Sequence, residues 1–171
     1  MRVKRQSSSR PNLWKGFLAG AFGGLIASFA MGKFYSLLPG SESYSQPGKE
    51  DSTVRVASAI SQTVFHYELT PYQKKIAGTA VHYTFGTTMA AAYGVLVEFR
   101  RSERLGWGLP FAFAIWLGAH VIIVPAFGLS EPITRVAPNA EAAEFASHLV
   151  YGAVAEGLRR LLRKYPLSLG H

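Results

Sequence analysis

Three histidines lie inside long apolar stretches of the sequence, where a titratable side chain is costly. They are His82, His120 and His148, and Glu144 precedes the last of them by four residues. Imidazole and carboxylate groups bind divalent metals, two histidines can ligate haem, and histidine titrates near physiological pH. The four residues therefore point to a metal site, a haem site or a pH-sensitive polar cluster. The alternative is that they only make hydrogen bonds between helices.

The rest of the sequence carries no recognisable catalytic motif. Cysteine is absent, which excludes disulfides, cysteine zinc sites, iron–sulfur clusters and cysteine nucleophiles. No Walker loop, HExxH motif or Ser–His–Asp order is present. We therefore expect a protein that is not an enzyme. Its cofactor stays unassigned: the first expectation is none, and a divalent metal or haem is the alternative.

The elements that must position these histidines follow from the distribution of charge. The 171 residues have a formal net charge of +8, but the charges gather at the ends and in the loops. Between them lie uncharged stretches that approach the roughly 20 residues a membrane-spanning helix needs. We expect an all-α, polytopic integral membrane protein with four transmembrane helices. The expected spans are about residues 14–38, 76–97, 107–127 and 142–162.

The fourth span is the most polar of the four. It contains Glu144, Glu156 and Arg159, so it can cross a bilayer only if these groups lie near the interfaces or face protein. The helical spacing also predicts that Glu156 pairs with Arg159 or Arg160, and that Glu98 pairs with Arg101.

The basic residues predict the topology. Twelve of the 18 Lys and Arg residues lie in the N-terminal segment, the 98–106 loop and the C-terminal tail. By the positive-inside rule, both termini then lie in the cytoplasm, which an even number of spans allows. We expect a multi-pass protein of a bacterial inner membrane, with a basic tail at 1–13, one membrane domain at 14–164 and a tail at 165–171. The positive charge suits anionic lipid at the cytoplasmic face, and nucleic acid is not an expected partner.

This topology places the three histidines at one depth. His82 lies six residues past Ile76, His120 lies five before Pro125, and His148 lies six past Ala142. At a rise of about 1.5 Å per residue, each is roughly 8–9 Å below the outer boundary. Three different helices thus bring imidazole to one level of the outer half of the bilayer.

The outer loop, residues 39–75, contains a predicted helix of its own. Residues 39–48 are rich in Ser, Gly and Pro and are typical of a linker. Asp51 or Ser52 can then cap a short amphipathic helix over Thr53–Tyr67. This helix either lies on the outer membrane face or caps the protein's own spans, and we favour the second. Thr70-Pro71 predicts the start of the second span, and Pro138 that of the fourth.

Two spans carry small residues at every fourth position, a pattern typical of close helix packing in lipid. In the first span they are Gly16, Gly20, Gly24, Ser28 and Gly32. In the second they are Gly78, Gly86, Ala90 and Gly94, with His82 at the intervening position. The stripes predict tight packing, either within one chain or in a homo-oligomer. Pro125, Gly128 and Pro132 should break the outer end of the third span, so that its backbone lines the histidine pocket.

Several short motifs are similar to those of one protein family. They are Gly118-Ala119-His120 with Pro125, Gly128-Leu129 and Pro132; Glu144-Phe-Ala-Ser147-His148 with Tyr151-Gly152; and His82-Tyr83-x-Phe85-Gly86 with Tyr93-Gly94. Together they resemble the YagU-like family of small bacterial inner-membrane proteins, over most of the chain from the first span to Arg163. Tyr151 departs from the pattern, since tryptophan is expected there. The resemblance implies a polytopic membrane protein of unassigned activity, in a family with some links to acid resistance, and it transfers no catalytic residue.

We therefore expect a small membrane protein of envelope or acid-stress physiology, which responds to pH or conducts protons through its histidine cluster. One alternative is a metal- or haem-binding membrane subunit. The other is a structural or assembly protein that packs through its glycine stripes.

Overall fold

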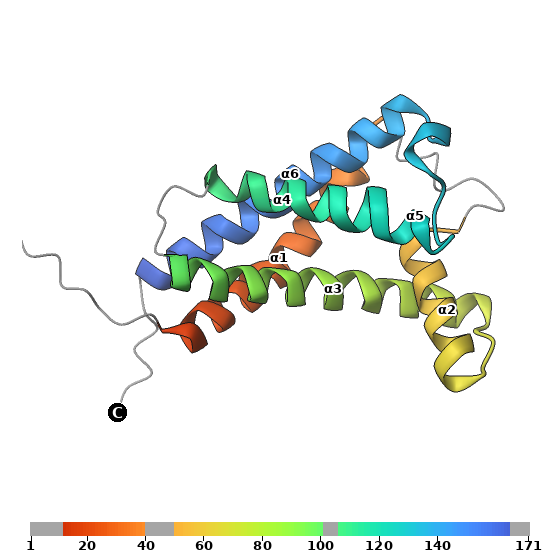
Figure 1. The fold of residues 1–171 in the computed structure, drawn as a ribbon, viewed down its shortest axis with the longest axis horizontal. Coiled ribbons are helices and arrows are strands. Elements are labelled where there is room, and N and C mark those ends of the chain that lie inside the picture. Colours follow the sequence, from red (N-terminus) through yellow and green to blue (C-terminus); the bar gives the residue numbers. More distant parts are fainter. Residues whose placement is uncertain (1–11, 40–49, 101–105, 165–171) are drawn as a thin grey trace, which may run out of the picture.

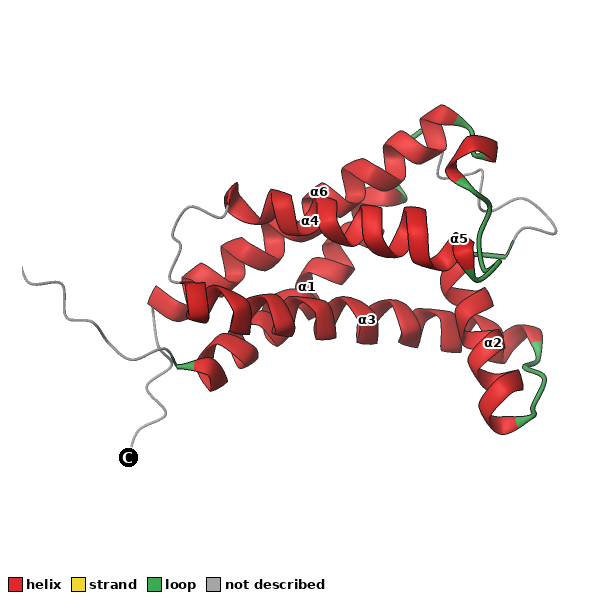
Figure 2. Cartoon of the chain, in the orientation of Figure 1, coloured by secondary structure: helices red, strands yellow, loops and turns green. Residues whose placement is uncertain are grey.

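The computed structural model describes residues 12–39, 50–100 and 106–164, all of them in helices and short connections (Figures 1 and 2). The long helices are α1 (Leu13–Tyr35), α2 (Ser52–Phe65), α3 (Pro71–Arg100) and α6 (Pro138–Lys164). Between α3 and α6 lie η2 (Gly106–Gly108), α4 (Leu109–Ile115), η3 (Trp116–Ile123), α5 (Val124–Ala126) and η4 (Ile133–Arg135). The all-α prediction is confirmed. Most of the predicted linker and of both tails falls outside the described residues.

Local sequence explains where the helices begin. The carboxylate of Asp51 accepts a hydrogen bond from the Thr53 backbone N–H at 2.9 Å and so caps α2. At the start of α3, the Gln73 side chain accepts from the Thr70 N–H at 2.9 Å, while the Thr70 hydroxyl accepts from the Gln73 N–H. This reciprocal pair is a capping box, which satisfies two N–H groups that the helix itself leaves unpaired. The predicted starts of these two helices are confirmed.

The helices form a bundle with two distinct ends. α1 packs along both α3 and α6, α2 packs on α3, and α4 packs on α6. The start of α1, the end of α3 and the end of α6 lie together at one end, which we call the Glu98 end (Figure 1). The opposite end holds α2 and the first turns of α3, and we call it the α2 end.

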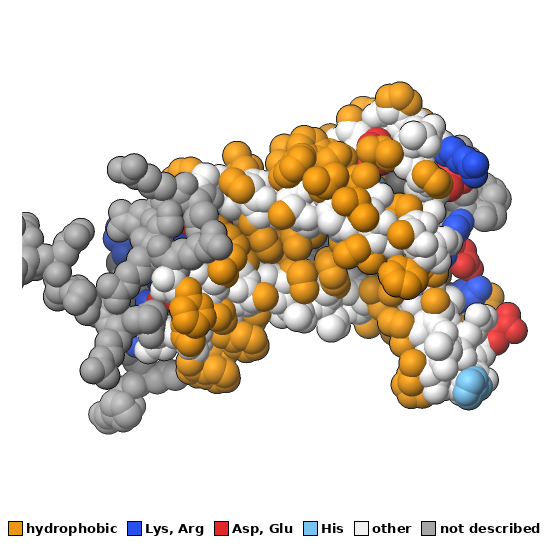
Figure 3. All heavy atoms as spheres, viewed as in Figure 1, with side chains coloured by type: hydrophobic (Ala, Val, Ile, Leu, Met, Phe, Trp, Pro, Cys, Tyr) orange, Lys and Arg blue, Asp and Glu red, His pale blue; other side chains and the backbone are white. Residues whose placement is uncertain are grey.

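Two segments are long and apolar enough to cross a membrane, Leu13–Tyr35 and Gly106–Ala126. Helices α3 and α6, with 30 and 27 residues, are also long enough for the hydrocarbon core but are more polar. Hydrophobic side chains cover the middle of the face shown in Figure 3, and charged side chains gather toward the two ends. The chain thus combines two apolar helices of membrane length with two more polar ones.

The glycine stripes pack against each other within the chain. A Cβ added to Gly16 would lie 2.7 Å from the Gly94 carbonyl oxygen, and one added to Gly24 would lie 2.9 Å from that of Gly86. Such distances are possible only because glycine has no side chain, and α1 and α3 therefore approach backbone to backbone. The stripe ends before the α2 end: a Cβ on Gly32 would meet nothing within 4 Å, and Gly78 faces Val54 of α2 instead of α1.

The third predicted span is irregular in its second half. Residues Trp116–Ile123 form a π-helix, in which the Val124 N–H donates to the Ala119 carbonyl. Pro125 follows directly; it has no N–H and its ring disturbs the preceding turn. The helix ends at Ala126, and Gly128 adopts a φ of +70°. The predicted break is confirmed, but the prediction that this backbone lines the histidine pocket is wrong, because the cavity described below is lined by other residues.

Candidate functional site

Two helices bring together four titratable side chains, His120 from η3 and Glu141, Glu144 and His148 from α6. We call them the cavity cluster. His120 Nε2 lies 3.4 Å from Glu141 Oε2, and its Nδ1 lies 3.7 Å from Glu144 Oε1. The same Glu144 oxygen lies 3.8 Å from His148 Nδ1, and the two imidazole centroids are 5.8 Å apart. Of the four residues predicted to converge, the structure brings His120, His148 and Glu144 together, whereas the ring of His82 contacts the Ser28 carbonyl of α1.

Backbone carbonyls hold the other two imidazoles of the predicted site. His148 Nδ1 lies 2.9 Å from the Glu144 carbonyl oxygen, one turn earlier on α6. His82 Nε2 lies 3.1 Å from the Ser28 carbonyl oxygen of α1. A carbonyl only accepts, so each of these ring nitrogens carries a proton. His82 and His148 are thus fixed as hydrogen-bond donors between or within helices, whereas His120 has a carboxylate at each ring nitrogen.

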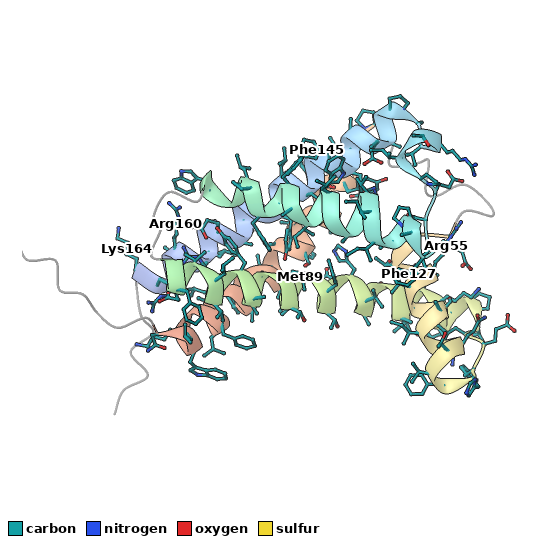
Figure 4. The ribbon with its side chains drawn as sticks, viewed as in Figure 1. Arg55, Met89, Phe127, Phe145, Arg160 and Lys164 are labelled. Atoms are coloured by element: carbon teal, nitrogen blue, oxygen red, sulfur yellow. The ribbon has the colours of Figure 1, made fainter. Side chains whose placement is uncertain are left out.

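The indole of Trp116 completes the cluster on the side away from Glu144. Its Nε1 donates to Glu141 Oε1 at 2.9 Å. The ring packs edge-on against Phe145 at 4.8 Å, on the outer side of α6 (Figure 4). The partly buried indole therefore reports directly on the carboxylate that faces His120.

A cavity of about 900 Å³ lies between α1, α2 and α3 at the α2 end. His82, His120 and Glu144 are among its lining residues, so all three predicted site helices contribute to it. Helix α2 supplies one wall through residues 51–54, and α1 supplies another through Met31 and Tyr35. The cavity begins where the small-residue stripe no longer packs: Ser28 and Gly32 both line it, and a Cβ on Gly32 would meet nothing within 4 Å.

Helix α2 packs on the protein itself. Its buried residues are Ala57 and Ser61, and Val54 lies against Gly78 of α3. The expectation that this helix packs on the chain itself agrees with its contacts to α3. Ile60, Val64 and Phe65 remain exposed on its other side.

One ion pair lies at the cavity entrance. Lys74 Nζ lies 2.8 Å from Glu50 Oε1, and this hydrogen bond raises the pKa of Lys74. The cavity cluster has no such partner: within the described ranges, no Lys or Arg forms an ion pair with Glu141 or Glu144. Its only possible cations are the histidines themselves.

The opposite half of α6 carries a different group, which we call the arginine cluster: Glu156, Arg159 and Arg160. Glu156 is 1% exposed, and its carboxylate accepts from Arg159 Nε at 2.7 Å and from Arg160 Nε at 2.5 Å. The predicted pairing of Glu156 is confirmed. Glu98 accepts from Arg163 at 2.6 Å; its predicted partner Arg101 lies outside the described residues.

Sequence reasoning missed two members of the site. They are Glu141 and Trp116, neither of which was placed among the candidate site residues. Their spacing could have indicated both, since Glu141 precedes Glu144 by three residues and Trp116 precedes His120 by four. Only the packing of η3 on α6, however, shows that the two pairs face each other.

The arrangement limits what the site can hold. In the described part of the chain, no three His, Asp or Glu side chains are placed so that they could hold a metal ion. The Glu144 carboxylate lies within 3.8 Å of both His120 and His148. It would have to move before an iron could be ligated between these rings.

One family model matches residues 42–157, more than half of the chain, and describes a protein of unknown function, DUF1440. The chain belongs to the DUF1440 family. The match includes α2, α3 and the whole cavity cluster, whereas α1 lies before it. No curated protein and no solved structure shows significant similarity to this DUF1440 protein.

Proposed function

We propose that this DUF1440 protein crosses a bacterial inner membrane four times, through α1, α3, the 106–126 segment and α6. Two of these segments have the length and hydropathy of spans. The start of α1 and the end of α6 lie at the same end, as an even number of crossings requires. The basic residues near both termini favour the Glu98 end as the cytoplasmic side. The α2 end then faces outward, and the YagU-like motifs agree with this location.

We propose further that the protein responds to external pH through the cavity cluster. The observation that carries this proposal is that both ring nitrogens of His120 face carboxylate oxygens. A neutral imidazole has one N–H and one lone pair, so one of the two contacts would then be repulsive. Protonation gives His120 a second N–H and makes both contacts favourable.

The surroundings of His120 favour a response to pH over conduction of protons. The groups that face it are Glu141, Glu144 and His148 of α6, with His82 of α3 and Asp51 beside α2 farther across the cavity. Toward the Glu98 end, the buried core of Ala27, Ala90, Tyr151 and Ala155 follows. This mostly apolar layer lies between the cavity cluster and the arginine cluster, which favours a response to pH over conduction of protons.

The alternative functions have less support. Among the described residues, no three His, Asp or Glu side chains are placed to hold a metal ion, and a haem iron between the two rings would require Glu144 to move. The assembly alternative relied on the glycine stripes, and the α1 and α3 stripes are used within the chain. The pH response needs no such rearrangement.

Trp116 provides the test, because its indole donates to the carboxylate that faces His120. Trp14→Phe and Trp107→Phe leave Trp116 as the only tryptophan. In proteoliposomes, its emission should change with a single titration step as external pH falls from about 8 to about 5. His120→Gln should abolish the step. His66→Asn should leave it unchanged, because His66 is exposed with φ of 52°, a conformation that asparagine tolerates.

Two results would overturn the proposal. One is an emission that stays constant over this pH range in the His120 protein. The other is an equal step in the His120→Gln variant, provided that circular dichroism shows both proteins to be folded.

A further inference from the structure

The cavity is lined by the carboxyl group of Glu144, which forms no ion pair with Lys or Arg among the described residues. Glu141 lies behind His120, and Asp51 faces Glu144 from the capped end of α2. The Lys74 ammonium forms an ion pair with Glu50, and Lys75 is exposed at the cavity entrance. A carboxylate held away from water binds either a proton or a cation.

The size and walls of the cavity indicate the kind of cation. Its volume of about 900 Å³ far exceeds the roughly 30 Å³ that one water occupies, and it falls in the range of small-molecule pockets. Its lining combines apolar and aromatic side chains, Met31, Val54 and Tyr83, with the carboxylate of Glu144. Such walls suit an alkyl chain, and an aromatic face adds attraction for a positive charge.

We propose that this cavity binds a small organic ammonium ion, with its charge against Glu144 and its alkyl part along the apolar walls. The inference rests on the proposed function in one respect, because the ammonium ion and the proton compete for the same cluster. Protonation of Glu144 or His120 removes the negative charge that the ammonium needs, so acid should release the ligand.

The charged and titratable groups that face Glu144 determine this competition. They are His120 from η3, Glu141 and His148 on α6, His82 from α3, and Asp51 at the start of α2. Three are histidines, which become cationic in acid. All of them therefore change the potential at Glu144 in the direction that disfavours a bound ammonium ion.

Isothermal titration calorimetry of the full chain in detergent, with n-butylammonium as the probe and n-butanol as its neutral match, tests the inference. We expect saturable binding of one n-butylammonium at about pH 8, weaker by about tenfold or more at about pH 5. We expect no saturable heat with n-butanol. Glu144→Gln should abolish binding, and Glu68→Gln should preserve it, because Glu68 is exposed and does not line the cavity.

The inference is overturned if folded protein gives no saturable heat at about pH 8, if n-butanol binds equally, or if Glu144→Gln binds as well as the parent. The pH dependence of the parent protein tests it without any variant, and equal affinity at both pH values also overturns it. Absent binding together with an intact Trp116 titration refutes this inference alone. Loss of both signals refutes the proposed function as well.

Discussion

The two halves of α6 bury carboxylates in opposite ways. Glu156, in the half near the Glu98 end, has two arginines within 2.7 Å. Glu144, in the half near the α2 end, has only two imidazoles, at 3.7 and 3.8 Å. Arginine stays charged at every physiological pH, whereas histidine gains and loses its charge. The arginine cluster is thus electrostatically fixed, and the cavity cluster can switch.

Helix packing is also tighter near the Glu98 end than near the α2 end. Near the Glu98 end, Gly16 and Gly94 let α1 and α3 meet backbone to backbone. Near the α2 end, Gly32 faces the open cavity with nothing close to it. In the half near the Glu98 end, the helices pack closely and the carboxylate of Glu156 is paired with arginines. In the half near the α2 end, a cavity lies between the helices, and Glu144 forms no ion pair with Lys or Arg among the described residues. We infer that the first holds the bundle together and that the second carries the function.

Neutralising one glutamate in each half should have the largest and most unequal effect. Glu156→Gln leaves two arginines without their buried carboxylate and should lower the free energy of unfolding by about 3 kcal/mol. Glu144→Gln removes a carboxylate that has no arginine or lysine partner, so it should leave stability at about pH 8 unchanged or higher. Unfolding in detergent, followed by circular dichroism, measures both. An equal loss of free energy of unfolding in the two variants would contradict this difference between the two halves of α6.

A methyl group added at each end of the small-residue stripes should give the next largest difference. Gly94→Ala places a Cβ against the Gly16 carbonyl and should cost about 2 kcal/mol as α1 moves away. Gly32→Ala adds its Cβ to open space and should change stability little. The same unfolding assay applies. A loss on Gly32→Ala as large as that on Gly94→Ala would show that the stripe packs beyond Ser28.

The smallest effect should come from the layer between the two halves. The Tyr151 hydroxyl, which is buried, donates to the Gly86 carbonyl at 2.5 Å. Tyr151→Phe removes this bond but keeps the ring, so it should lower the free energy of unfolding by about 1 kcal/mol. The Trp116 pH titration should keep its midpoint. A shifted midpoint would show that the layer does not insulate the cavity cluster.

The helices were predictable because their signals are local. Asp51, Thr70-Pro71 and Pro138 mark helix starts through caps and proline, and Glu156 finds its arginines within one turn of its own helix. The partner of Glu98 was not predictable in the same way. Its pairing with Arg163 joins two helices that lie far apart in the sequence.

The candidate site was predictable in which residues lie near one another but not in their contacts. Counting residues along each span placed His82, His120 and His148 at one level, and all three lie near one cavity. Counting could not show how each ring is rotated about its helix. Because of that rotation, the rings of His82 and His148 contact backbone carbonyls, whereas the ring of His120 faces two carboxylates.

The sequence by itself determined the helical class, the helix starts and the small-residue stripes, because each depends on signals along one helix. Only the tertiary structure decided that the stripes of α1 and α3 pair within the chain, that they end where a cavity begins, and that Glu141 joins His120. These features depend on how one helix is turned toward another. Side-chain packing sets that rotation, and no period in a single helix encodes it.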